Sequence, residues 1–207
     1  ELYVEEIKKI LVIPNSSLFP IYVFEKTDVN MMDDKTKDGI HIIIGITMDR
    51  NLQILLRTNV LKKINSVFES LPLINSMEEV LDETITKGTT NWQLYGSRKP
   101  GNDPYLLTYH YDVRIIDSDD FQLCENDVNE FDIKNNFSKL TAQYKEHVSF
   151  EMNQDIKEIY EELKGKQKKP KQRLTIVGKK MDIFSVTNHD QLKQLIDQYL
   201  DKIEPSD

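Results

Sequence analysis

KDGIHIIIG, residues 37–45, places a histidine inside an otherwise apolar run that follows an Asp-Gly turn signal. Side chains alternate between the two faces of a strand, so a strand here puts Ile42 and Ile44 on one face and His41 on the other. One interpretation of His41 is a half-buried core histidine with a single hydrogen bond. The other is a ligand contact at the start of the strand, and the rest of the chain has to distinguish the two.

The segments around this run predict an α+β fold. Apolar residues recur at helical spacing over 51–70, which predicts an amphipathic helix, and Ser76 with Glu79 three residues later predicts the start of a second, short helix. Runs rich in β-branched and aromatic residues predict strands. We therefore expect a mixed or antiparallel sheet packed under helix 51–70, with strands at 21–25, 40–48, 91–98 and 104–116.

The chain becomes more polar after residue 135. We expect a helix at 154–164, an exposed basic loop after it, and an amphipathic helix at 190–203. The sequence thus predicts a main domain at 1–135 and a helical, charged extension at 136–207.

The net charge of −8 argues against a protein that simply coats nucleic acid. The charge is segregated, however, because KGKQKKPKQR at 164–173 is strongly basic. This stretch is either a solvated loop or a DNA contact. The candidate DNA-binding residues are Lys166, Lys168, Lys169, Lys171 and Arg173.

The single cysteine, Cys124, excludes an internal disulfide and is typical of a reducing compartment. No apolar run approaches the roughly 18 residues of a membrane span, so we expect no membrane partner.

Three groups of residues have the chemistry of a nucleotide site. Lys37 and His41 flank Gly39, an arrangement in which both side chains reach one phosphate while the glycine lets it approach the backbone. The alternative is an exposed turn lysine beside a core histidine. Asp82, close to a helix end, suits a hard cation such as Mg²⁺ or Mn²⁺, although capping is the commoner role of such a residue.

The third group is Ser97, Arg98 and Lys99, which follow a predicted strand and Gly96. A hydroxyl and two cations at a strand tip suit a triphosphate or a nucleic-acid backbone. The segment is not a Walker loop, because the GxxxxGK[ST] spacing is missing.

In this order, KDGIHIIIG, VLDETI and TTNWQLYGSRKPGNDPYLL resemble motif II, motif III and the following strand of archaeo-eukaryotic primases. The resemblance is greatest to the primase domain of the primase–helicases of large nucleocytoplasmic DNA viruses, and PrimPol-type enzymes share the layout. It covers roughly residues 20–115. It implies that the sheet is the RRM-like half of a primase catalytic core.

The resemblance also implies roles for individual residues. His41 would contact the phosphates of the incoming nucleotide, Lys37 and Gly39 would line the same pocket, and Ser97 and Lys99, with Arg98 between them, would lie near the triphosphate. Asp82 would be one of three carboxylates that hold catalytic Mg²⁺ or Mn²⁺. Gln93 departs from the pattern, since PrimPol-type enzymes carry an arginine there.

A second departure concerns motif I, a hydrophobic strand that ends in Asp-x-Asp or Asp-x-Glu and precedes motif II. We find no match before residue 37, and Asp117 and Asp119 of IIDSDDF lie downstream of motif III, where we interpret them as a solvated strand exit. We therefore expect the chain to be the C-terminal larger part of a primase domain, incomplete and inactive alone, with a helicase beyond residue 207.

The function implied is that of a viral DNA primase or primase–polymerase. It would transfer nucleotides from NTP or dNTP on a single-stranded DNA template, in a viral replication factory of the host cytoplasm, joined to the helicase domain of the same polypeptide. One alternative is a non-catalytic DNA-binding or helicase-docking module that keeps the primase fold. Another is an unrelated enzyme that uses His41 with Asp112 or Asp117.

Overall fold

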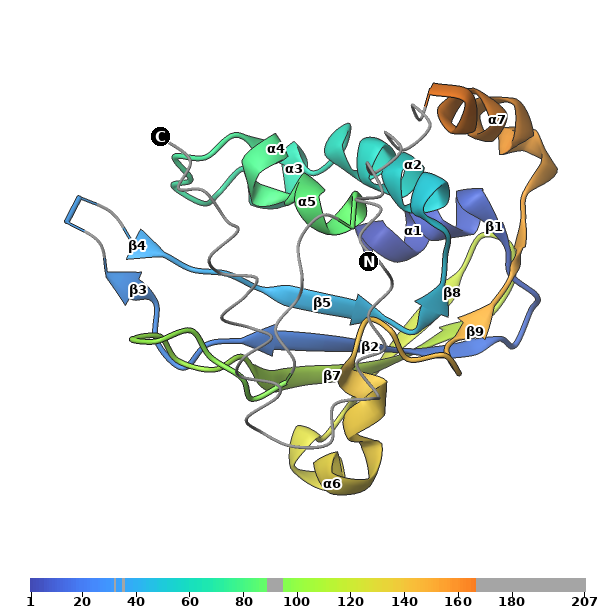
Figure 1. The fold of residues 1–207 in the computed structure, drawn as a ribbon. Helices are drawn as coiled ribbons and strands as arrows, with labels where there is room; N and C mark the ends of the chain where they lie inside the picture. Colours follow the sequence, from blue (N-terminus) through green and yellow to red (C-terminus); the bar gives the residue numbers. More distant parts are fainter. Residues whose placement is uncertain (32, 35, 89–94, 167–207) are drawn as a thin grey trace, which may run out of the picture. The chain divides into compact units, whose positions relative to one another are not determined.

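The computed structural model describes residues 1–31, 33–34, 36–88 and 95–166, and residues 1–166 form one compact unit. Its centre is a four-stranded antiparallel sheet in the order β5-β2-β7-β8 (Figure 1). Its strands are β5 (His41–Ile44), β2 (Leu18–Glu25), β7 (Leu106–Ile115) and β8 (Phe121–Asn126). The predicted α+β class, with an antiparallel sheet flanked by helices, is confirmed.

Three of the four predicted strands are present, and the one at 40–48 is divided by Gly45 into β5 and β6 (Ile46–Thr47). The backbone N–H of Gly45 donates to the Pro20 carbonyl at 2.8 Å. A Cβ at Gly45 would lie 2.6 Å from Cδ of Pro20, so this close crossing requires glycine.

Strand β8 is not among the predicted strands. Its alternation fits a strand, since Phe121 and Leu123 pack against buried residues of β2 and β7 while Gln122 is exposed. Cys124 lies in this strand opposite Asp112 and is a free, half-buried thiol.

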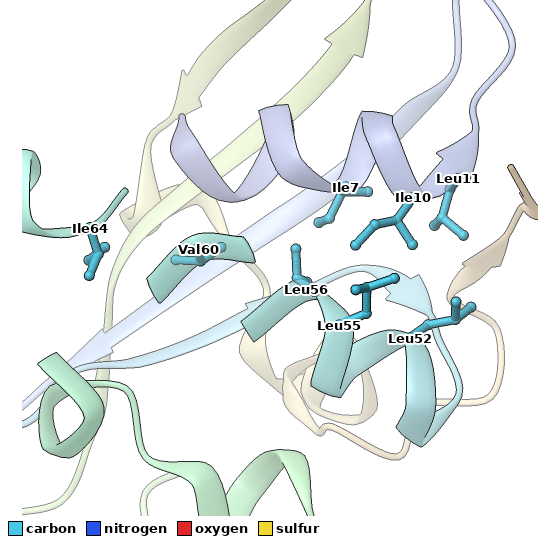
Figure 2. Close-up of a cluster of buried hydrophobic side chains, with 8 residues drawn as sticks. All are labelled: Ile7, Ile10, Leu11, Leu52, Leu55, Leu56, Val60 and Ile64. Carbon is cyan, nitrogen blue, oxygen red and sulfur yellow. The ribbon is translucent and has the colours of Figure 1, made fainter. Parts of the chain in front are cut away.

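Helices α1 (Leu2–Ile10) and α2 (Arg50–Leu61) lie on one side of the sheet (Figure 1). Figure 2 shows the apolar cluster that joins them. Each fully buried aliphatic side chain contributes about 1.5–3 kcal/mol relative to exposure. The cluster comprises Ile7, Ile10, Leu11, Leu52, Leu55, Leu56, Val60 and Ile64. The predicted helix at 51–70 is confirmed as α2 followed by the short α3 (Asn65–Phe68).

Helix α2 begins at an aspartate cap that also binds the last described helix. One carboxylate oxygen of Asp49 accepts from the backbone N–H groups of Asn51 and Leu52, at 2.8 and 3.0 Å. The other accepts the hydroxyl of Tyr160 at 2.7 Å. Tyr160 belongs to α7 (Lys157–Lys166), which confirms the predicted helix at 154–164.

The short helices α4 (Met77–Val80) and α5 (Glu83–Thr86) follow on the same side. Ser76 and Glu79 form the predicted capping box at the start of α4. Arg57 of α2 donates to the carbonyls of Leu81 and Glu78, at 2.8 and 2.9 Å, which fixes this segment on the helical layer.

The opposite face of the sheet packs against residues 127–144, which include α6 (Ile133–Asn136) (Figure 1). Tyr22 is buried there and stacks on His110, with ring centroids 4.9 Å apart. Burial, together with the negative charge of Asp112, raises the pKa of Tyr22 to about 12.

Short strands tie distant parts of the chain together. β1 (Leu11–Val12) pairs with β10 (Glu151–Met152), and β6 pairs in parallel with β9 (Val148–Ser149). A small hairpin of β3 (Asn30–Met31) and β4 (Thr36–Lys37) precedes β5. The division of the chain at residue 135 stays a prediction, and the predicted helix 190–203 lies outside the described residues.

Candidate functional site

Three chain segments meet at one end of the central sheet. β2 is antiparallel to both neighbours, so the end of β2 lies beside the beginnings of β5 and β7. The register places Phe24 opposite His41 and Glu25 opposite Leu106. The residues just after β2, just before β5 and just before β7 therefore share this end, which is also the end of the β3–β4 hairpin (Figure 1).

His41 stacks on Tyr105 at this end. The two ring centroids are 3.7 Å apart and the rings are inclined by 17°. Burial lowers the pKa of His41, and the positive charge of Lys26 lowers it further. The neutral imidazole is therefore the favoured form at pH 7. His41 is half-buried and is the first residue of its strand, so a ligand contact there stays a prediction beside the interpretation as a core histidine.

Gly39 completes this arrangement. A Cβ at Gly39 would lie 2.7 Å from the hydroxyl oxygen of Tyr105, so any larger residue displaces that ring. The Asp38 carboxylate accepts from the N–H of Gly39 at 2.8 Å. Burial raises the pKa of Tyr105, and the negative charge of Asp38 raises it further. The turn formed by Asp38 and Gly39 before β5 therefore packs closely against Tyr105, which precedes β7.

Lys26 lies on the same tyrosine. Its Nζ is 5.3 Å from the centroid of the Tyr105 ring and donates to Oδ1 of Asn102 at 3.4 Å. Asn102 in turn donates its backbone N–H to the Lys99 carbonyl at 3.1 Å. The loop that carries the predicted triphosphate residues is thus joined to the end of β2.

The predicted strand at 91–98 is wrong for residues 95–98, which form a turn and an irregular segment. Gly96 and Gly101 have φ of +73° and +74°, a left-handed conformation that interrupts strand pairing. Arg98 and Lys99 are exposed in this loop, as is Ser97. Residues 91–94, including Gln93, lie outside the described residues.

Lys37 and Asp82 are placed by local structure. Lys37 pairs with Asn30 in the β3–β4 hairpin, and its side chain is exposed. Asp82 is the N-cap of α5, where its carboxylate accepts from the backbone N–H and the hydroxyl of Thr84, at 2.9 and 2.8 Å. Convergence of Asp82 with His41 and Lys99 on one ligand stays a prediction.

The comparisons with known proteins identify the family of this chain. Residues 1–111 match the model of the family described as the C962R protein N-terminal AEP domain, which is just over half of the chain. The chain belongs to this family. The match covers His41, Asp82, the loop from Ser97 to Lys99, and Tyr105, and it confirms the resemblance to archaeo-eukaryotic primases.

A relative of this AEP-domain chain occurs in a giant virus. The protein named "Putative helicase L207/L206" of Acanthamoeba polyphaga mimivirus is 37% identical over 113 residues, which is 53% of this chain. The chain spans only 12% of the length of that protein.

A catalytic metal ion in this AEP domain would need several carboxylates close together. Within residues 1–31, 33–34, 36–88 and 95–166, no group of three or more histidine, cysteine, aspartate or glutamate side chains is arranged to hold a metal ion. Asp82 caps α5 through its Oδ1 atom. The described residues therefore do not form a complete two-metal centre.

The remaining candidate residues have simpler positions. The Asp117 carboxylate accepts from the N–H groups of Asp119 and Asp120 in the turn between β7 and β8, as expected for a strand exit. Asp117 lies beyond the far end of β7, a strand that spans about 30 Å from Leu106, next to Tyr105, to Ile115. A joint site of His41 and Asp117 is thus excluded.

Of the basic stretch, Lys166 ends α7 and the other four candidate residues lie outside the described part of the chain. No helix among the described residues has the length and apolar character needed to cross a membrane.

Lys26, Asn102 and Tyr105 form, together with His41, the cluster around the Tyr105 ring. Of these four residues, the sequence identified only His41 as a candidate. The only available signal for the other three was their position, since Lys26 follows a strand and Asn102 and Tyr105 lie in the Asn-Asp-Pro-Tyr segment that leads into the next one.

Proposed function

We propose that this chain is the nucleotide-binding part of a DNA primase or primase–polymerase domain that acts with the helicase domain of the same polypeptide. Membership of the AEP family and the similarity to a viral helicase support this function. The reaction would be transfer of a nucleotide from NTP or dNTP on a single-stranded DNA template, within a viral replication factory of the host cytoplasm.

The observation that carries the proposal is the His41–Tyr105 stack. It joins the KDGIH turn to the GSRKPGNDPY loop, which are the two segments that the primase resemblance assigns to nucleotide binding. These segments are far apart in sequence, and the antiparallel sheet brings them to one end.

The roles of the individual residues follow from their chemistry. We propose that His41 donates a hydrogen bond to a phosphate oxygen and that Lys37 adds positive charge. Gly39 would line the same pocket by making room for the Tyr105 ring on which His41 stacks. The exposed Ser97, Arg98 and Lys99 would bind the outer phosphates, which are strong acceptors.

We propose Mg²⁺ or Mn²⁺ as the cofactor of a longer protein that contains this chain, with Asp82 as one ligand. In such reactions the metal stabilises negative charge on the phosphates. The further carboxylates would come from outside the described residues.

The test is primer synthesis by a longer protein that contains this chain together with its flanking regions. Synthesis on a single-stranded template with Mg²⁺ is expected, and loss of nucleotide binding in His41→Ala is expected to abolish most of it. A protein that binds NTP or dNTP but never forms a phosphodiester bond, with either metal, contradicts the enzymatic function.

The second candidate is a non-catalytic DNA-binding or helicase-docking module. The capping role of Asp82 favours it, because a carboxylate held by Thr84 has less freedom to bind metal. DNA binding or helicase binding that persists in His41→Ala, without any primer synthesis by the unmodified protein, is the result expected for this candidate.

A further inference from the structure

Lys26 has no assigned role, yet its ammonium group lies within the candidate site. It is half-buried directly after β2, 5.3 Å from the centre of the Tyr105 ring. Asn102 holds it from the side of the 95–105 loop. A lysine ammonium has three protons to donate, and Asn102 is its only hydrogen-bond acceptor among the described residues, so two protons can serve a ligand.

The imidazole of His41 lies against the same ring, 3.7 Å from its centre. Lys26 and His41 are close enough to influence each other, because the Lys26 charge contributes to the low pKa of His41. Among the described residues, the ionisable groups near the imidazole include the Tyr105 hydroxyl and, beside that tyrosine, Asp38.

The positive charge of Lys26 is not balanced locally. Among the described residues no carboxylate lies within ion-pair distance of its Nζ, and Asp38 accepts instead from the backbone of Gly39. A half-buried ammonium beside an imidazole favours an anion at the same place, because the anion stabilises both positive forms.

We propose that Lys26 binds the same phosphate group as His41, so that the two residues form a polyphosphate site built on the Tyr105 ring. The inference rests on the proposed nucleotide-binding function and adds a residue from outside the recognised motifs. Its ligand is the phosphate chain of a nucleoside triphosphate. The backbone phosphates of single-stranded DNA offer the same chemistry and are the competing source.

The first experiment measures binding of inorganic tripolyphosphate to the 207-residue chain by calorimetry, in buffer without magnesium. Removing a charge-assisted hydrogen bond in Lys26→Met is expected to raise the Kd about tenfold or more. Lys26→Arg, which keeps the charge, should retain most of the affinity. The matched control is Lys157→Met, an exposed lysine of α7, which should change the Kd less than about twofold.

The second experiment reads the site directly by NMR titration of His41. Tripolyphosphate should raise the pKa of His41 in the unmodified chain, because a bound anion favours the imidazolium. Lys26→Met should raise the pKa of His41 in the free chain. If Lys26→Met does not fold, two measurements still test the inference. One is the titration of His41 in the unmodified chain with tripolyphosphate. The other is the same titration in Asn102→Ala, which removes the hydrogen-bond partner of Lys26.

An unchanged Kd for tripolyphosphate in Lys26→Met, or a His41 pKa that tripolyphosphate leaves unaltered, overturns the inference. So does a result in which Lys26→Met weakens binding of an oligothymidylate but not of tripolyphosphate. Primer synthesis is not needed for either measurement. If the chain binds tripolyphosphate through Lys26 but a longer protein does not synthesise primers, only the proposed enzymatic function is refuted. If the Lys26→Met variant synthesises primers normally, only the inference about Lys26 is refuted.

Discussion

The carboxylate of Glu6 in α1 lies 2.7 Å from the ammonium of Lys63, although the Glu6 side chain is almost fully buried. Lys9 reaches the same oxygen at 2.7 Å. Burial opposes ionisation of Glu6, but the hydrogen bonds from Lys63 and Lys9 outweigh it and lower the pKa of this carboxyl group. The pair connects α1 to the residues that directly follow α2.

We expect Glu6→Gln to lower the free energy of unfolding by about 1–3 kcal/mol, because two charge-assisted hydrogen bonds to a buried acceptor are weakened. The measurement is chemical denaturation at pH 7. Glu5→Gln, on the exposed side of the same helix, is the matched control and should have little effect. An equal loss in both variants contradicts the role of the Glu6 pair.

The pH dependence of this effect has a defined sign. The pKa of Glu6 is lower in the folded state than in the unfolded state, where it is about 4.3. The contribution of Glu6 to the free energy of unfolding is therefore complete above the unfolded pKa and is lost as the pH falls through the folded pKa. The stability difference between the unmodified chain and Glu6→Gln should therefore narrow below about pH 4. A difference that widens on acidification is inconsistent with this assignment.

The stack on Tyr105 should control the protonation of His41. Tyr105→Ala exposes the imidazole, so the pKa of His41 is expected to rise toward its ordinary value of about 6.5. Tyr105→Phe keeps the ring and should leave the pKa nearly unchanged. NMR titration measures both, with His110 on β7 as an internal reference, and a His41 pKa insensitive to Tyr105→Ala contradicts the stack.

The contact between Gly39 and Tyr105 predicts a rescue. Gly39→Ala should displace the tyrosine ring, because the new Cβ would lie 2.7 Å from the hydroxyl oxygen, and nucleotide affinity should fall several-fold. Removing that hydroxyl in Gly39→Ala with Tyr105→Phe should restore most of the affinity. Calorimetry with a nucleotide provides the measurement, and a double variant as weak as Gly39→Ala would argue that the glycine is needed for another reason.

Asp82 allows its two roles to be separated. Asparagine caps helices about as well as aspartate but cannot replace a charged metal ligand. If Asp82 binds metal, both Asp82→Asn and Asp82→Ala should abolish primer synthesis in a longer protein. If it only caps α5, Asp82→Asn should remain active while Asp82→Ala loses thermal stability, and circular dichroism melting of both variants completes the comparison.

Local sequence patterns predicted the elements whose stabilising contacts are local. The apolar spacing of residues 51–70 and the Ser76–Glu79 box correspond to α2, α3 and α4 because each depends on residues a few positions apart. The strand expected at 91–98 is wrong over residues 95–98, also for a local reason, since Gly96 adopts a positive φ in a turn.

The cluster around Tyr105 could not be predicted in this way. Its contact with His41 depends on the register of β2 with both neighbours, including the irregularity between Val23 and Phe24. A register shift by one residue would reverse which face each side chain occupies. The motif residues were therefore identified as candidates, while Lys26 and Asn102 required the three-dimensional arrangement.

The pairing of β1 with β10 has a consequence for synthesis of the protein. Leu11 finds its strand partner only at Met152, so at ordinary elongation rates the nascent chain carries an open β1 edge for on the order of ten seconds. Until the ribosome has delivered that partner, the start of the chain offers an unpaired backbone to other nascent chains.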